Sequence, residues 1–160
     1  MSTAPVFGLL VLLYGHPAIV QPEQGRQIKS CPVLTDTEAS AVLGPGTMFV
    51  GGVEAMSGQV RISLLCEFVQ DERTLKVQAT KTLGDKDVWE TLRKMSNGKT
   101  EPGLGEYAYS AFDAGKSTVV IVKGGLTLEV VVGGKPTSSA DLPKAIDAGK
   151  KAASKLWPGQ

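Results

Sequence analysis

The sequence predicts an α+β domain built on one antiparallel sheet of about five strands, with the helices packed on one face of that sheet. Two observations favour this class. Turn residues at Asp71-Glu72 and at Gly124-Gly125 each join two strand-like segments, as in β-hairpins. Only three segments have apolar residues at helical spacing, and they do not alternate regularly with the strands. The expected order of elements is α-β-β-α-β-β-β-α.

The first helix is expected to begin after Thr35. Thr35 and Glu38 have the spacing of a capping box, in which each side chain accepts a hydrogen bond from the backbone N–H of the other residue. Val42 and Leu43 lie on one face of the helix, and Gly44 is typical of a helix end. The sequence therefore predicts a short amphipathic helix between Thr35 and Gly44.

A glycine-rich stretch, 45–58, follows this helix and is expected to be a loop with a short strand at 47–50. Apolar and polar residues then alternate along 60–69, which predicts a half-buried strand with Cys66 on the buried face. The stretch 73–82 is expected to pair with it as the second strand of a β-hairpin. The polar residues expected to point outward from this hairpin are Arg61, Ser63, Glu67, Lys76 and Gln78.

The second half of the chain is expected to hold two further helices and three strands. Asp85 predicts the N-terminus of a helix that ends at Met95. The expected strands are 107–112, 117–123 and 126–132. The run 119–122 is apolar on both faces, which is typical of a central strand. The last helix is expected at 139–157.

The length and the charge of the chain limit the classes of function that it could have. A chain of 160 residues accommodates one ordinary domain. Lys and Arg total 17 against 16 for Asp and Glu, without a basic face, which argues against a nucleic-acid partner. We expect an apolar leader at 1–20, a polar linker at 21–30 and a single domain at 31–158.

The leader predicts export. Residues 6–20 are apolar, too short to span a bilayer and similar to the central region of a signal peptide. The usual positive residues before the apolar run are missing, and no small-x-small cleavage site follows it. We expect a periplasmic or secreted protein with no stable membrane span after processing.

Two cysteines, Cys31 and Cys66, are present, and neither belongs to a Cys-x-x-Cys pair. The one histidine, His16, lies in the leader, so ligands for a zinc site and a partner for a nucleophilic cysteine are missing. In an exported protein the cysteines pair as a disulfide, whereas in a cytosolic protein they are two buried thiols. Cys31 follows a polar spacer and is not expected to carry a lipid.

Two nucleotide-binding patterns occur without their structural context. Residues 103–108 fit G-x-G-x-x-A, but a loop is expected before them and a strand after them. Gly-Lys-Ser at 115–117 lacks the glycine that a phosphate-binding loop needs five positions earlier. The carboxylate pairs at 36/38 and 85/87 lie in first helical turns, where the helix dipole favours them. We therefore expect no catalytic residue, metal or cofactor.

Several landmarks resemble those of the small secreted and lipoprotein domains of unknown function that are widespread in bacteria, especially actinobacteria. They are Cys31-Pro32-Val33-Leu34-Thr35 before a helix ending Val42-Leu43-Gly44, Cys66 in a strand, the stretches 103–109 and 119–132, and a final Ala/Lys-rich helix. The likeness covers about 31–156. It implies a cysteine-bridged α+β domain outside the cytoplasm. The family often has a lipidated cysteine directly after the signal sequence, and this chain departs from that pattern.

Three functions remain open. The leading hypothesis is a non-catalytic binding module of the cell envelope that recognises a protein or another envelope component through an open sheet face. Tyr107 and Tyr109 share one face of a strand and are the candidate binding surface, although aromatic residues on strands more often serve packing. The alternative is a small-molecule or lipid carrier with a cavity between sheet and helices. A hydrolase is the third, and it would need an isolated Ser–Lys or carboxylate pair.

Overall fold

The structure is a computed structural model that describes residues 25–58, 60–82 and 84–159. The predicted leader at 1–20 lies outside the described residues, as does the beginning of the predicted linker.

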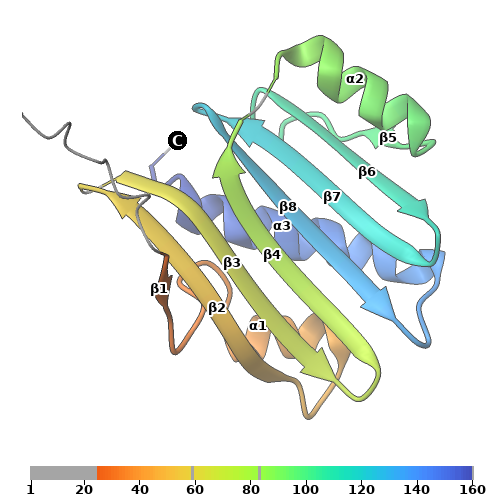
Figure 1. The fold of residues 1–160 in the computed structure, drawn as a ribbon. Coiled ribbons are helices and arrows are strands. Elements are labelled where there is room, and N and C mark those ends of the chain that lie inside the picture. The colour runs from red at the N-terminus through yellow and green to blue at the C-terminus, as the bar shows by residue number, and fades with distance from the viewer. Residues whose placement is uncertain (1–24, 59, 83, 160) are drawn as a thin grey trace, which may run out of the picture.

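The fold is built on one antiparallel sheet of eight strands in the order β1-β2-β3-β4-β8-β7-β6-β5 (Figure 1). The strands are β1 (Arg26–Gln27), β2 (Met48–Ser57), β3 (Val60–Gln70), β4 (Arg73–Lys81), β5 (Lys99–Thr100), β6 (Tyr107–Asp113), β7 (Lys116–Lys123) and β8 (Leu126–Gly134). The prediction of about five strands is wrong. Two of the additional strands, β1 and β5, are two-residue polar edges, and such short edges limit pairing with other chains.

The third additional strand, β2, occupies most of the stretch that was expected to be a loop. Its glycines made it resemble a loop, but Gly52 lies opposite Cys66 in the ladder with β3. A Cβ at Gly52 would lie 2.5 Å from the carbonyl oxygen of Leu65 and 2.9 Å from the side chain of Ile28. The glycine therefore permits close approach of the backbone between its neighbours rather than a turn.

Three α-helices accompany the sheet in the described residues: α1 (Asp36–Leu43), α2 (Lys86–Met95) and α3 (Leu142–Leu156), the last preceded by a 3-10 turn at Ser139–Asp141. The predicted cap of α1 is confirmed, because Thr35 and Glu38 form the reciprocal capping box. The predicted start of α2 is confirmed as well, because the Asp85 carboxylate accepts hydrogen bonds from the first-turn N–H groups of Asp87 and Val88.

The helices lie on both faces of the sheet, so the prediction that they pack on one face is wrong. Helices α1 and α3 cover the face that carries Cys66, and both lie behind the sheet in Figure 1. Helix α2 packs on the opposite face, where its Trp89 contacts the cluster of Tyr109, Val120 and Val122. We call these the disulfide face and the second face. The sequence of an amphipathic helix shows that one side of the helix is apolar. It does not show which face of the sheet that side will cover.

The core fills the space between the disulfide face and helices α1 and α3. Its largest fully buried side chains include Leu34, Phe68, Leu75, Ile121 and Leu128. The predicted disulfide is present, and it joins the segment before α1 to the centre of β3 across a sequence separation of 35 residues. The bridge therefore ties the N-terminal segment to the sheet, on the face that the two helices cover.

A buried arginine fixes the start of the last helix against the sheet. Arg73, at the start of β4, donates to the carbonyl oxygen of Leu43 at 2.8 Å and to Asp141 Oδ1 at 2.7 Å. Arg73 and Asp141 are both largely buried, so the pair is shielded from solvent. It holds α1, β4 and the turn before α3 together.

Candidate functional site

The second face of the sheet is covered only in part. Helix α2 packs over β6 and β7, while the same face of β3 and β4 has no helix over it in the described part of the chain. We call six central second-face positions of these two strands the open face. They are Ser63, Leu65, Glu67, Lys76, Gln78 and Thr80.

Four of the five residues predicted to point outward lie on the open face. Lys76 and Gln78 are exposed, and Ser63 and Glu67 are half-exposed. Arg61 is the exception, because the pairing of β2 with β3 is irregular between Ala55 and Met56. This irregularity turns Arg61 toward Glu54, whose Oε1 accepts a hydrogen bond from Arg61 Nε at 2.7 Å.

The open face mixes charge with an exposed apolar residue. Lys76 Nζ lies 3.1 Å from Glu67 Oε1, a cross-strand ion pair that leaves little net charge there. Leu65 lies opposite Gln78 and is 37% exposed. One exposed apolar side chain is ordinary on a protein surface, although a partner that lay over this face would bury it.

A pocket lies where α2 meets the open face, with a volume of about 310 Å³. We call it the α2 pocket. Its lining residues are Gln78 and Thr80 of β4, Trp89 and Leu92 of α2, Tyr109 of β6, Val120 of β7, and Thr127 and Glu129 of β8. Gln78 and Thr80 also belong to the open face, so the pocket and the open face form one continuous surface.

Glu129 is the charged residue of the α2 pocket and was missed by the sequence prediction. It lies in the middle of β8, between Gln78 on β4 and Val120 on β7. Burial raises the pKa of its carboxyl, and the nearby charge of Lys116 only partly offsets that effect. No side-chain hydrogen bond or ion pair joins this carboxylate to another described residue. In the sequence of β8, Glu129 is a single polar residue among apolar ones, and it looks the same as a residue that points to solvent.

Two aromatic residues form further walls of the α2 pocket. The indole Nε1 of Trp89 is buried and has no hydrogen-bond partner among the described residues. Tyr109 is only 7% exposed, and burial together with the charge of Glu129 raises the pKa of its phenol. The pocket thus brings together an indole, a phenol and a carboxylate whose polar atoms are not satisfied by neighbouring side chains.

The two tyrosines predicted as a binding surface lie together but differ in their contacts. Their ring centroids are 6.3 Å apart on the second face. The Tyr107 hydroxyl donates to Glu90 Oε2 of α2 at 2.8 Å, so Tyr107 holds the helix on the sheet. Hydrogen bonds from Arg93 and Tyr107 lower the pKa of Glu90 to about 2. Tyr109 lines the α2 pocket instead.

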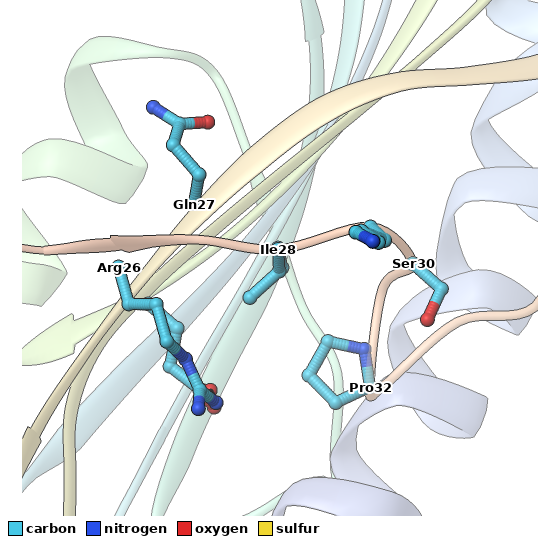
Figure 2. A pocket seen from close by; sticks show the side chains of 7 residues that line it. Arg26, Gln27, Ile28, Ser30 and Pro32 are labelled. Atoms are coloured by element: carbon cyan, nitrogen blue, oxygen red, sulfur yellow. Dashed lines mark hydrogen bonds and ion pairs between the residues drawn. The ribbon is translucent and has the colours of Figure 1, made fainter.

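A second hollow, shown in Figure 2, lies beside β1. Arg26 and Ile28 point to one side of the chain there, and Gln27 points to the other. Glu54 receives hydrogen bonds from Arg26 at 3.0 Å and from Arg61 at 2.7 Å. Burial alone would raise the pKa of Glu54, but these two bonds outweigh it and lower the pKa. Because the Glu54 carboxylate is already paired with two arginines, we interpret these contacts as holding β1 against β2.

Metal and membrane sites are not found in the part of the chain that the structure describes. No group of three or more His, Cys, Asp and Glu side chains there could hold a metal ion. None of the described helices is both long and apolar enough to cross a bilayer.

No protein-family model, curated protein or solved structure matches the chain. The resemblance to secreted and lipoprotein domains therefore stays a prediction. The α2 pocket and the open face beside it are the candidate functional site.

Proposed function

We propose that the protein is a non-catalytic binding module that works in the periplasm or outside the cell and holds its partner on the second face of the sheet. The partner is a protein or another envelope component. The observation that carries the proposal is the incomplete cover of this face, which leaves Leu65 exposed beside a pocket of unpaired polar groups. The near-neutral charge supports a partner other than nucleic acid.

The physical argument rests on the cost of unpaired polar groups. A solvated face is ordinary for an antiparallel sheet, so exposure alone carries little weight. A buried donor or acceptor without a partner costs about 1–3 kcal/mol, and the indole Nε1 of Trp89 is such a donor. That nitrogen is enclosed within the protein, so a partner would instead pair with the half-buried carboxylate of Glu129. Pockets with aromatic walls and a few polar groups are the usual form of a binding site.

The proposed compartment is supported by the disulfide. Bridges such as Cys31–Cys66 persist in oxidising compartments and are rare in the cytosol. The apolar leader predicted from the sequence is consistent with export. Intact mass of the protein recovered from its native compartment tests this, because the account expects a mature chain without residues 1–20 and with no free thiol before reduction. A retained leader with two free thiols would contradict it.

Photo-crosslinking from the open face tests the binding proposal. A benzophenone amino acid replaces Gln78 on the open face or, as the control, Lys150 on the exposed side of α3. We expect a discrete crosslinked product in the native envelope from position 78 and none from position 150. Excess unlabelled protein should compete for this product, whereas a Leu65→Asp variant should compete weakly. Equal crosslinking from both positions would contradict the proposal.

The α2 pocket favours a second candidate, a small-molecule or lipid carrier. The space between the sheet and helices α1 and α3 is filled by buried side chains, so a cargo would occupy the α2 pocket on the other face. Native mass spectrometry of the protein from its natural envelope tests this candidate. A bound mass that disappears in Trp89→Ala would support a carrier, and ligand-free protein in both forms would contradict it.

A further inference from the structure

The walls of the α2 pocket select the charge of a ligand. Glu129 is the one ionisable acid or base among its lining residues apart from the phenol of Tyr109. A pocket whose formal charge comes from one carboxylate repels anions and attracts cations. The other charged groups on the neighbouring second-face positions are a neutralising pair, Lys76 with Glu67, and Lys116 at the start of β7, whose charge offsets part of the effect of burial on Glu129.

No side chain among the described residues forms an ion pair with the Glu129 carboxylate, so the carboxylate can pair with a ligand. Glu54 on β2 is clamped by two arginines, and Glu90 on α2 is held by Arg93 and Tyr107. Glu129, which is half-buried, has no such partner in the described residues. Partial burial raises the pKa of this carboxyl and so disfavours its charged form, and a bound cation would offset that effect.

The aromatic walls favour an organic cation over a metal ion. A metal ion needs several oxygen, nitrogen or sulfur ligands, and the described residues hold no group that could supply them. Trp89 and Tyr109 instead present rings whose faces attract a cation, and indole is the strongest of the aromatic side chains in this respect. Leu92 and Val120 add apolar surface for the body that carries the charge.

We infer that the α2 pocket binds an organic cation, an ammonium group on a small apolar body, with the charge against Glu129 and the rings of Trp89 and Tyr109. This inference rests on the proposed function and names the chemistry that the binding face recognises. The volume of about 310 Å³ is at the lower end for small-molecule pockets, so it accommodates one ammonium group with a short arm. The opening toward Gln78 lets a larger ligand continue over the open face.

A fluorescence titration with three matched probes tests the inference. The chain has two tryptophans, so a Trp157→Phe background leaves Trp89 as the reporter inside the pocket. The probes are benzyltrimethylammonium, its uncharged carbon isostere neopentylbenzene, and the anion phenylmethanesulfonate. We expect the cation to change Trp89 fluorescence and to bind at least about tenfold more tightly than either other probe.

Two substitutions test whether Glu129 causes the preference for the cation over its uncharged isostere. Glu129→Gln keeps the shape of the side chain and should weaken binding of the cation at least about fivefold while leaving binding of the isostere unchanged, because only the rings of Trp89 and Tyr109 then favour the cation. Glu72→Gln removes the same charge at the exposed turn between β3 and β4, outside the α2 pocket and the open face, and should leave the preference intact. If Glu129→Gln does not fold, Gln78→Lys replaces it, because position 78 is exposed and lies opposite Glu129. The ammonium of that variant should occupy the site and abolish cation binding.

The contrary outcomes separate this inference from the proposed function. Equal binding of the cation and the isostere, or a preference of the same size in Glu129→Gln as in the wild type, overturns the assignment to organic cations but leaves a binding pocket. No response to any probe at millimolar concentration also overturns it. In both cases crosslinking from position 78 still decides whether the second face binds a partner.

The ammonium could be free or could belong to a lipid headgroup, and a sedimentation experiment distinguishes the two sources. Co-sedimentation with phosphatidylcholine vesicles but not with phosphatidylglycerol vesicles supports the inference and assigns the lipid. Response to benzyltrimethylammonium without sedimentation supports it and assigns a free cation. Equal sedimentation with both vesicles, unaffected by Glu129→Gln, would overturn it.

Discussion

Removing the disulfide should lower the free energy of unfolding by an amount that depends on the length of the loop that the bridge closes. Cys31 and Cys66 are separated by 35 residues, and the bridge joins the N-terminal segment to a central region of the sheet. Closing a loop of this length lowers the entropy of the unfolded chain enough to contribute about 4 kcal/mol at 25 °C. For a domain of this size, that loss corresponds to a melting temperature lower by roughly 10–20 °C.

The assay is urea unfolding followed by circular dichroism, with and without a reductant. The double variant Cys31→Ala/Cys66→Ala, measured without reductant, should match the reduced protein within about 1 kcal/mol, because both lack the crosslink and differ by two small side chains. A change on reduction of less than about 1 kcal/mol would refute the reasoning. It would mean that the segment before α1 separates from the sheet before the rest of the domain unfolds.

Three further predictions follow from single residues. Trp89→Ala should detach α2 and cost about 2 kcal/mol, with hydrogen-exchange protection lost in α2 and kept in the sheet, since Trp89 is the aromatic anchor of a helix with no fully buried residue; protection lost everywhere would contradict this. The raised pKa of Glu129 means that the folded state binds its proton more tightly than the unfolded state, so wild-type stability falls as the pH rises through its titration. Glu129→Gln should therefore be more stable than wild type at pH 7 and equal to it at pH 3 in urea unfolding, and an advantage that is the same at both would contradict the pKa direction. Gly52→Ala should cost about 1–3 kcal/mol because its Cβ would meet the carbonyl oxygen of Leu65 at 2.5 Å, whereas the control Gly133→Ala, with its nearest atom at 3.5 Å, should be close to neutral in the same assay.

Patterns that depend on neighbouring residues in the chain could be predicted from the sequence. The capping box at Thr35, the cap at Asp85 and the hairpin through Asp71-Glu72 are local, and each appears in the structure. The disulfide was predicted only together with export, and the structure contains it. These features need no knowledge of which elements pack together.

Features set by distant contacts could not be predicted in the same way. Gly52 belongs to a strand because Leu65 and Ile28 approach it closely, and a glycine in a sequence looks the same in a turn. The irregular pairing of β2 with β3 turns the Arg61 side chain away from the open face. The alternation of apolar and polar residues in the sequence does not reveal this change of register. The residues that line the α2 pocket with Glu129 come from three other strands and a helix, so the pocket appears only once α2 is placed on the second face.

The central claim is that the second face of the sheet, at the α2 pocket and the open face beside it, is where this protein binds its partner. Crosslinking from position 78 against position 150 tests it most directly, because both positions are exposed and they lie on opposite sides of the molecule. We predict a discrete product from position 78 in the native envelope that unlabelled protein competes away. A product of the same yield from position 150, or one formed only there, would contradict the claim.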